Sequence, residues 1–337
     1  MAYQVTLRPS GHDFAVAPGA TILDAALDAG INLPYGCKNG ACGACKGKVL
    51  AGRVDHGAAQ DHALSAAERA AGLALFCCAK PLSDLRLDVR ELDAARDIPV
   101  KIMPCRVQKL ERLADDVMAI SLKLPASERL QFLAGQYIEF LLADGKRRAF
   151  SLANAPHDDA LLEIHVRRVP GGNFTEHVFT TLKERDILRL EGPFGTFFLR
   201  EDSTKPILLV AGGTGFAPLK GLVEHALHIG VDRPLTLYWG AKNRAGLYMT
   251  ALAERWAAAH PQLTYIPVLS APAPADAWTG RTGLVHEAVL ADHPDLSRYQ
   301  VYACGAPAMC EAAVRDFTAR GLPREEFFAD VFSYAPR

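Results

Sequence analysis

The stretch Tyr35–Lys48, YGCKNGACGACKGK, places three cysteines within nine positions and separates them almost entirely with Gly, Ala, Lys and Asn. These cysteines are Cys37, Cys42 and Cys45. Glycine adopts backbone conformations that other residues avoid, so a segment of this composition can wrap closely around a group held by sulfur. A further thiol is available downstream in LFCC, at either Cys77 or Cys78. The stretch therefore predicts a thiolate-bound metal centre that organises the fold around it.

The spacing of the cysteines indicates the kind of centre. Four residues separate Cys37 from Cys42, two separate Cys42 from Cys45, and 31 separate Cys45 from Cys77. This is the spacing of plant-type [2Fe-2S] ligands. A zinc ribbon usually needs two CxxC pairs, and this loop contains one. The glycines of the loop allow backbone amides to approach the cluster sulfurs, which tunes the potential.

Length and composition limit what the whole chain can be. The 337 residues, half of them apolar, predict two or three domains. The formal net charge is −1 and no long basic run occurs, so nucleic acid is not an expected partner. We find neither a secretory signal nor an apolar run near the roughly 20 residues that span a bilayer. We expect a cytoplasmic monomer without membrane contact, in which reduced thiols bind metal.

The first part of the chain predicts a small mixed domain. The predicted elements are strands near 3–9, 13–17, 46–54 and 85–89 and a helix capped by Thr21 and ending at Gly30. With the cysteine pattern, residues 1–92 resemble a plant-type ferredoxin domain of β-grasp architecture. In that family the fourth ligand commonly stands in L-x-C-x-x-x-P, which Leu75–Pro81 matches. The resemblance implies Cys77 as the fourth ligand and Cys78 as a buried thiol.

A second domain follows a charged, proline-interrupted linker predicted at 93–103. Short strands separated by turn signals, without long helices, predict an antiparallel β-barrel over residues 104–202. The predicted strands are 105–113, 117–124, 160–169 and two that flank a turn at 143–145.

Arg148-Ala149-Phe150-Ser151, within this barrel, resembles the R-x-Y-S signature of the ferredoxin-NADP reductase superfamily, with Phe in place of the usual Tyr. A guanidinium suits a flavin phosphate, a flat ring packs on the isoalloxazine, and a hydroxyl can reach its N5/O4 edge. The resemblance implies Arg148, Phe150 and Ser151 as FAD-binding residues, with Ser151 close to the chemistry. Phe150 preserves the stacking and loses any hydrogen bond that Tyr makes.

The next segment offers a seat for the pyrophosphate of the flavin nucleotide. A Pro-Gly-Gly turn leads into a helical stretch at 176–184, and amides at a helix N-terminus favour anions. An ordinary hairpin turn and a solvent-facing His165 are the alternatives. The order and distance from RAFS match the superfamily, which favours flavin binding. The implied residues are His165, Val166, Arg167, Gly171, Gly172, Asn173 and Thr175.

From residue 203 to 337, strands alternate with helices, which predicts a parallel sheet covered by helices on both faces. The predicted helices are 217–229, 247–259, 284–291 and 307–320. A glycine-rich turn follows the strand ILLVA and leads into a helix, which is the context expected for a nicotinamide-nucleotide pyrophosphate. The expected binding residues in this segment are Gly212, Gly213, Thr214, Gly215 and Pro218.

A second cluster lies at another strand end and resembles the C-G-x-x-x-M element of the same superfamily. It comprises Cys304, Gly305, Pro307 and Met309. In the superfamily this Cys approaches the nicotinamide where hydride leaves, which implies Cys304 as a catalytic residue. An inert buried thiol is the alternative. The C-terminal segment also resembles the superfamily, whose late aromatic residue, here Phe332, covers the flavin until nicotinamide displaces it.

The preference between NADH and NADPH depends on the residues after the strand LTLYWG. Lys242 and Arg244 could grip a 2′-phosphate, which would favour NADPH, or could be solvated loop charges. The resemblance to oxygenase reductases, which mostly use NADH, favours NADH.

Taken together, the motifs resemble reductases of the ferredoxin-NADP reductase superfamily over essentially the whole chain. The segments GRVDHG (52–57), FCCAKP (76–81) and EGPFGTFFLRED (191–202) contribute to the resemblance. It implies a multidomain α+β and α/β chain that passes electrons from NADH through FAD to the [2Fe-2S] cluster and then to a partner protein. The implied partner is a deoxysugar dehydrase or a terminal oxygenase. A redox sensor or electron-transfer subunit without its own turnover is the alternative.

Overall fold

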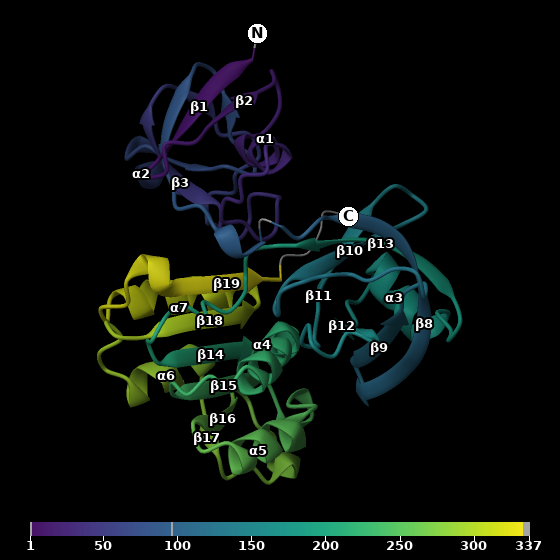
Figure 1. The fold of residues 1–337 in the computed structure, drawn as a ribbon. Coiled ribbons are helices and arrows are strands. Elements are labelled where there is room, and N and C mark those ends of the chain that lie inside the picture. The colour runs from purple at the N-terminus through teal and green to yellow at the C-terminus, as the bar shows by residue number, and fades with distance from the viewer. Residues whose placement is uncertain (1, 96, 333–337) are drawn as a thin grey trace. The chain divides into compact units, whose positions relative to one another are not determined.

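The structure, a computed structural model, describes residues 2–95 and 97–332 (Figure 1). Its contacts divide the chain into two compact units. The first comprises Met1–Ile98 with Gly195–Phe197, and the second comprises Pro99–Phe194 with Phe198–Arg337. None of the helices in the described residues is long and apolar enough to cross a membrane.

The first unit is built on a five-stranded mixed sheet in the order β2-β1-β7-β3-β5. Its strands are β1 (Tyr3–Arg8), β2 (Asp13–Val16), β3 (Lys46–Ala51), β5 (Leu73–Leu75) and β7 (Leu85–Asp88). β1 and β2 form an antiparallel hairpin, and β1 pairs in parallel with β7. Alternate residues of these strands, such as Val5, Leu7 and Leu87, are fully buried. This alternation is why the sequence pattern predicted β1, β2, β3 and β7, whereas the three-residue strand β5 was not predicted.

Two short helices and a small ribbon complete the first unit. The helix α1 (Ile22–Asp28) begins where predicted, because Thr21 Oγ1 accepts a hydrogen bond from the Asp24 amide at 3.1 Å. A second helix, α2 (Ala66–Ala70), was not predicted, although Ser65 and Glu68 form a capping box at its start. The ribbon pairs β4 (Val54–Asp55) with β6 (Lys80–Pro81).

The second unit begins with six antiparallel strands in the order β11-β10-β13-β8-β9-β12. They are β8 (Lys101–Ala114), β9 (Val117–Lys123), β10 (Tyr137–Leu141), β11 (Arg147–Ser151), β12 (Leu162–Arg167) and β13 (Ile187–Phe194). A bridge between Leu152 and Ile164 joins the two ends of this order, so the sheet closes into the predicted barrel. Closure leaves no unpaired edge and fixes the segment after β11 beside β12.

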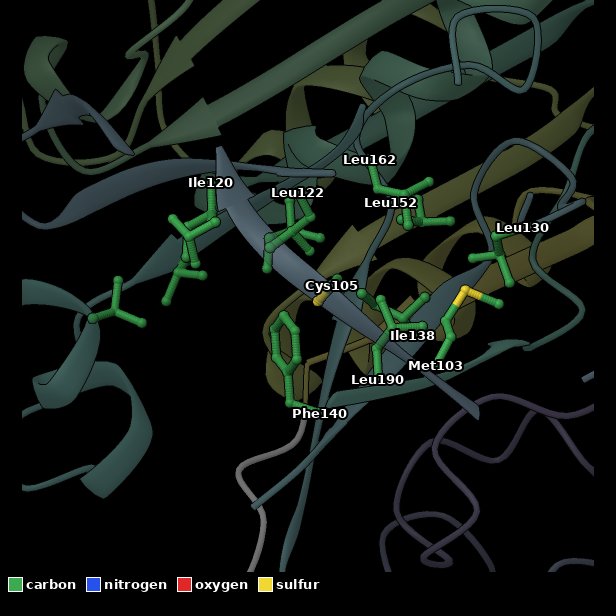
Figure 2. Packing of buried hydrophobic residues seen from close by; sticks show 14 of the residues in the cluster. Met103, Cys105, Ile120, Leu122, Leu130, Ile138, Phe140, Leu152, Leu162 and Leu190 are labelled. Carbon is green, nitrogen blue, oxygen red and sulfur yellow. The ribbon is translucent and has the colours of Figure 1, made fainter. Parts of the chain in front are cut away.

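The barrel is filled by apolar side chains that point inward from every strand. Figure 2 shows Cys105 of β8, Ile120 and Leu122 of β9, Ile138 and Phe140 of β10 and Leu190 of β13 in this core. Fully burying one such large apolar side chain contributes about 1.5–3 kcal/mol. Between β12 and β13 the chain forms one helix, α3 (Asn173–Thr180). The predicted range 176–184 was shifted because Gly172, in an extended conformation, is the N-cap.

The rest of the second unit is a six-stranded parallel sheet in the order β17-β16-β15-β14-β18-β19. Its strands are β14 (Ile207–Gly212), β15 (Leu235–Ala241), β16 (Leu263–Leu269), β17 (Arg281–Thr282), β18 (Gln300–Gly305) and β19 (Phe327–Val331). The edge strand β19 was not predicted. The central strands β14 and β18 are almost entirely buried, as expected for a sheet covered by helices.

Four helices pack on this sheet and agree with the predicted positions to within a few residues. They are α4 (Phe216–His228), α5 (Thr250–Ala259), α6 (Val285–Asp292) and α7 (Pro307–Thr318). The prediction placed the start of α5 at residue 247, but residues 244–246 form a separate 3-10 turn capped by Asn243. Figure 1 shows α4 on the side of the sheet that faces the barrel. This helix follows directly from the glycine-rich turn at the end of β14.

Candidate functional site

Two thiols of the cysteine-rich loop lie against each other. The amide of Cys37 donates to Cys42 Sγ at 3.4 Å, and the amide of Cys42 donates to Cys37 Sγ at 3.3 Å. Cys45 is buried in the same loop, and Cys77 and Cys78 are buried thiols. A [2Fe-2S] cluster takes four cysteines, two for each iron. The donor set of these thiols therefore suits this cofactor.

The pair of Cys37 and Cys42 already favours one thiolate. The hydrogen bond from the Cys42 thiol is the main cause that lowers the pKa of Cys37 to about 6, against the opposing effect of burial. The same bond, together with burial, raises the pKa of Cys42. Because the thiolate is the form that binds metal, the loop provides a site prepared for an electropositive centre.

Cys78 occupies a different position from Cys77. Its Sγ lies 3.7 Å from Cys77 Sγ and packs beneath Gly40, where an added Cβ would come within 2.7 Å of that sulfur. The same Cβ would meet Ala58 O at 2.9 Å, and the φ of Gly40 is +76°. Only glycine fits there. Burial is the main cause that raises the pKa of Cys78 to about 12. Cys78 therefore packs behind the loop, against Gly40.

The RAFS segment forms β11 at the edge of the barrel order. Arg148 is half-buried and donates from Nη1 to its neighbour's carbonyl, Arg147 O, at 2.8 Å. The Phe150 ring packs against Phe140 and Phe174, with ring centroids 5.8 and 5.3 Å away. Arg148 and Phe150 share one face of the strand and Ser151 is on the other, as strand alternation requires.

Arg167, at the end of β12, is the clearest candidate anion-binding group in the barrel. Its Nη1 donates to Asp116 Oδ2 at 3.0 Å, whereas Nε and Nη2 are buried and have no partner within the described residues. A Cβ placed on Gly213, in the glycine-rich turn, would lie 3.4 Å from Arg167 Nη2. Buried donors are normally paired, so these two N–H groups are suited to an anionic acceptor. The pyrophosphate of FAD is an acceptor of this kind.

The turn after Arg167 is held by its own backbone geometry and by side-chain hydrogen bonds. Gly171 has φ of +74°, and Gly172 is the N-cap of α3. The Thr175 hydroxyl bonds within this turn, because it accepts from Val169 N at 3.1 Å and donates to Val169 O or to Gly172 O, each at 3.2 Å. Asn173 is exposed at the first position of α3. The hydroxyl of Thr175 thus serves the turn itself, and the free amides at the start of α3 carry the affinity for an anion.

The two glycine-containing segments of the nicotinamide domain meet at the carboxyl ends of β14 and β18. A Cβ on Gly215 would lie 2.0 Å from Cys304 O, and one on Gly212 would lie 2.5 Å from Met309 Sδ. Gly305, with φ of +151°, faces Gly212 O. The neighbours Val166, Thr214 and Pro218 are buried, and Pro307 is the first residue of α7. The predicted residues thus form one cradle, in which two glycine-containing segments pack closely at the strand ends where a dinucleotide binds such a sheet.

Ser151 is joined to this cradle by a residue that the sequence analysis missed. Ser151 Oγ donates to Asp330 Oδ2 at 2.6 Å, and Asp330 lies on β19 in register with Cys304 on β18. Burial, followed by the charge of Asp330, raises the pKa of Cys304, which keeps the thiol protonated. Beside them, Phe332 N donates to Gly305 O at 2.9 Å. The signal in the sequence was the position of Asp330 two residues before Phe332, but its role depends on the unpredicted strand β19.

His165 faces the nicotinamide domain from within the barrel. Its ring is completely buried, with Nε2 2.8 Å from Glu163 Oε1 and Nδ1 3.0 Å from Tyr248 Oη. Burial lowers the pKa of His165, so the ring is neutral near pH 7. Both ring nitrogens are therefore engaged with protein groups, and the ring is not solvent-facing.

Comparison with known proteins agrees with these three parts. Residues 5–82 match a 2Fe-2S iron-sulfur cluster binding domain, residues 104–199 an oxidoreductase FAD-binding domain, and residues 209–315 an oxidoreductase NAD-binding domain. The chain therefore carries sites for a [2Fe-2S] cluster, FAD and a nicotinamide nucleotide. Fold and sites define an iron-sulfur flavoprotein reductase, an NAD(P)H-dependent oxidoreductase that transfers electrons to a partner.

The chain belongs to the family of three-domain iron-sulfur flavoprotein reductases that includes dehydrase reductases and the reductase components of oxygenases. It is 44% identical to a CDP-6-deoxy-L-threo-D-glycero-4-hexulose-3-dehydrase reductase of Yersinia pestis, a match that covers 98% of this chain and 99% of that protein. It is 37% identical to reductase component 2 of a terephthalate 1,2-dioxygenase of Comamonas, over 100% and 99% of the two chains. A cytochrome P450 reductase of Amycolatopsis has a similar structure, with a TM-score of 0.78, 37% identity and coverage of 98% and 99%.

Proposed function

We propose that this reductase takes electrons from NADH and supplies them to a dehydrase that acts on a CDP-linked deoxysugar. The observation that carries the proposal is the 44% identity with a dehydrase reductase over 98% of the chain, which exceeds the 37% identity with an oxygenase reductase component. The balanced reaction is NADH plus two oxidised one-electron acceptors giving NAD⁺, a proton and two reduced acceptors. FAD, when bound, converts the two-electron hydride into the single electrons that an iron-sulfur cluster carries.

The cofactor-binding residues of this proposal are those that the geometry supports. Cys37, Cys42, Cys45 and Cys77 ligate the cluster, which is supported by their spacing and by the packing of Cys78 against Gly40. Arg148, Phe150, Ser151, Arg167 and the turn at 171–175 hold FAD. The cradle of Gly212–Gly215 and Cys304–Met309 holds the nicotinamide nucleotide. The proposed domains remain 1–92, 104–202 and 203–337, joined by a linker at 93–103.

The residues around the cradle have distinct roles in this proposal. The Asp330 carboxylate accepts a hydrogen bond from the Ser151 hydroxyl and so fixes the orientation of Oγ. The buried thiol of Cys304, which burial and the charge of Asp330 keep protonated, packs at the carboxyl end of β18, where the nicotinamide ring would lie in this proposal. Phe332 covers the flavin face until nicotinamide replaces it, and its backbone bond to Gly305 supports this position.

The contacts of the loop after β15 support NADH. Arg244 is hydrogen-bonded to a neighbouring turn. Its amide donates to Asp276 Oδ1 at 3.3 Å, and its Nη1 donates to Asp276 O at 3.2 Å. The carboxylate of Asp276 stands beside the basic group and disfavours a second negative charge there. Of the basic pair, only Lys242 is exposed without a recorded partner in the described residues. One mobile lysine is a weak basis for binding a 2′-phosphate.

A terminal oxygenase is the second candidate acceptor, supported by the identity of 37% with a dioxygenase reductase component and of 38% with a phenol 2-monooxygenase reductase component. We also propose that the reductase is a cytoplasmic monomer. A sensor without its own turnover is the remaining alternative, because the same three cofactors would report on a redox state.

The test is anaerobic reduction of the purified holoprotein, followed by reconstitution with each acceptor. NADH should bleach the flavin and then the iron-sulfur bands, and NADPH should do so more slowly. The reduced protein should then support turnover of a CDP-deoxysugar dehydrase. Turnover with an aromatic-ring oxygenase alone would overturn the proposed acceptor. Slow cytochrome c reduction, with no turnover of either acceptor, would favour the sensor.

A further inference from the structure

The flavin barrel and the nicotinamide domain meet along α4 through a set of buried polar side chains. We call Glu163, His165, Lys220 and Tyr248 the α4 junction. Glu163 and His165 lie on β12 of the barrel, Lys220 lies on α4, and Tyr248 lies just before α5. All four belong to the second unit. Because burial of polar groups costs free energy unless they are paired, their contacts need an explanation.

Lys220 is the most constrained member of the α4 junction. It is only 6% exposed, and its ammonium group has three acceptors. Nζ donates to Ala153 O at 3.1 Å, to Glu163 Oε2 at 3.3 Å and to Glu224 Oε1, which is at 3.1 Å. Two of these acceptors, Ala153 and Glu163, belong to the barrel. Lys220 therefore connects the first turns of α4 to the barrel segment at Ala153, two residues after Ser151.

The carboxylate of Glu163 connects the two branches of the α4 junction. Its Oε2 meets Lys220, and its Oε1 meets His165, whose other nitrogen reaches Tyr248. Burial would raise the pKa of Glu163, but the His165 hydrogen bond and the Lys220 charge outweigh it and lower that pKa to about 2. The group is thus a carboxylate at every pH at which the protein works.

The second branch continues to the nicotinamide cradle. The Tyr248 ring packs edge-on against Trp239, with centroids 5.1 Å apart. Trp239 Nε1 donates to Gly213 O at 2.9 Å, and its ring stacks on Phe216, the first residue of α4, at 3.8 Å. Both branches therefore lead from Glu163 to the glycine-rich turn and the start of α4.

The backbone of α4 also lies unusually close to the barrel. A Cβ on Gly221 would come within 2.9 Å of Asn154 O, so the helix approaches the segment after Ser151 to the limit that glycine allows. At the other end of α4, His228 stacks on His157 with ring centroids 3.7 Å apart. The segment is held from its other side, because Asn154 Oδ1 accepts from Glu163 N at 2.8 Å.

We propose that the α4 junction positions the nicotinamide cradle against the flavin-binding strand, with Lys220 and Glu163 as its two principal positioning residues. The inference rests on the proposed hydride transfer from NADH to FAD in this chain. On the flavin side, one residue separates Ser151 from Ala153, the barrel residue that Lys220 contacts. On the nicotinamide side, two residues separate Gly213 from the first residue of α4. Because both connections are short, the Lys220–Glu163 ion pair can set the distance between the flavin site and the nicotinamide site.

The reason for such a device is the sensitivity of group transfer to distance. A misplacement of about 1 Å can cost on the order of 100-fold in rate. A small shift between the parallel-sheet domain and the barrel would therefore change the rate. An ammonium group with three acceptors within 3.3 Å, buried beside a glycine contact, opposes both sliding and rotation along α4.

The first test compares Lys220→Met with the wild-type holoprotein. The substitution keeps the length of the side chain and removes the charge. We expect the saturating rate of flavin reduction by NADH to fall about 10- to 100-fold, with a smaller change in the half-saturating NADH concentration. The isotope effect with deuterated NADH should rise, because hydride transfer becomes rate-limiting. Reduction by dithionite should be unchanged.

A second readout does not depend on turnover. In the FAD-loaded Lys220→Met protein, amide hydrogen exchange should accelerate in residues 152–158 and 216–228, and stay unchanged in the first unit. Tyr248→Phe keeps the ring and removes one hydrogen bond, so we expect the same pattern with a loss of a few-fold. This variant keeps the inference testable if Lys220→Met does not fold.

The control is Lys205→Met. Lys205 forms an ion pair with Glu326 at 2.8 Å within the nicotinamide domain and makes no recorded bond to the barrel among the described residues. We expect its flavin reduction rate to stay within twofold of wild type. Equal losses in Lys205→Met and Lys220→Met would overturn the inference.

The double variant Glu163→Gln/Lys220→Met separates positioning from charge balance. It removes the charges of the Lys220–Glu163 pair and leaves the Glu224 carboxylate, so thermal stability should recover in part relative to Lys220→Met. If the ion pair positions the two sites, the hydride transfer rate of the double variant should remain low, because the pair is still absent. Recovery of both stability and rate would overturn the inference. If wild-type protein were not reduced by NADH at all, the proposed function would fail instead, so the two failures are distinguishable.

Discussion

The cysteine-rich loop and the α4 junction hold their groups by different means. The loop places three thiols within nine contiguous residues, and its glycines allow the backbone to follow the cluster. The junction joins residues 57 and 83 positions apart, and no spacing rule marks them. A cluster imposes a fixed geometry on its ligands, so its spacing is constrained along the chain. A packing contact imposes geometry only in space, so a sequence pattern does not reveal it.

The largest effect is expected at the adjacent thiols Cys77 and Cys78. Substituting each in turn shows which one binds the cluster and which one only packs behind the loop. Cys77→Ser should lose the cluster completely, since Cys77 stands at the fourth-ligand position of the L-x-C-x-x-x-P pattern. Cys78→Ser is the matched control and should keep the iron-sulfur absorption bands. The protein should lose some stability, because the Cys78 sulfur packs against Gly40. Absorption spectra and iron content after anaerobic reconstitution measure the result. The reverse outcome would move the ligand to Cys78.

A methyl group in the nicotinamide cradle should have the next largest effect. Gly215→Ala would place Cβ 2.0 Å from Cys304 O, so β18 or the turn must shift. We expect a loss of about 3 kcal/mol in unfolding free energy and little reduction of the flavin by NADH, with the cluster bands unchanged. Gly230→Ala is the control, because its φ of +72° is strained but its Cβ meets nothing within 4 Å. It should cost only about 1–2 kcal/mol.

Substitution of Arg167 tests whether this residue binds FAD. Its buried Nε and Nη2 have no acceptor among the described residues, so Arg167→Ala removes two donors available to a pyrophosphate. Hydrogen bonds of charged groups contribute about 1.5–3 kcal/mol, which corresponds to a loss of roughly 10- to 100-fold in FAD affinity. Arg168→Ala, which removes an exposed pair with Glu176, should change that affinity less than twofold. Flavin fluorescence quenching measures both constants, and equal affinities would contradict the assignment.

The pH dependence of stability tests the charge at the α4 junction. Glu163 has its pKa lowered from 4.5 to about 2, so it stabilises the folded state fully above pH 4.5 and loses this contribution as pH falls toward 2. The difference in unfolding free energy between wild type and Glu163→Gln should be about 1–2 kcal/mol near neutral pH and shrink over that interval. Denaturant titrations at a series of pH values measure it. A difference that does not change with pH would show that Glu163 acts only by packing.

The smallest effect is expected at the nucleotide specificity loop. Lys242 is exposed, and Arg244 is held by Asp276. Lys242→Ala should therefore change the half-saturating NADH concentration less than twofold and leave the preference for NADH over NADPH intact. Steady-state reduction of cytochrome c with each nucleotide measures this. A large loss confined to NADPH would indicate a 2′-phosphate site and reverse the assigned preference.

The parts of the fold that depend on local pattern were predicted well. Alternation identified β1, β2, β3 and β7 of the first unit, and the strand-turn-helix context identified the turn at Gly212–Gly215. The start of α3 was predicted three residues late, because its N-cap is Gly172 and glycine also fits a loop. The edge strand β19 was missed, and with it Asp330, because its pairing partner lies elsewhere in the chain.

The amino-acid sequence by itself predicted the order of the three domains, which the family matches confirm, and it predicted the thiols and turns that we propose as cofactor sites. Each of these is set by residues that are neighbours along the chain, where spacing and backbone freedom decide what can bind. Only the tertiary structure decided that Ser151 meets Asp330, 179 positions away, and that Glu163 meets Lys220. Hydrogen bonds need partners within about 3 Å, and packing alone brings distant segments to that distance.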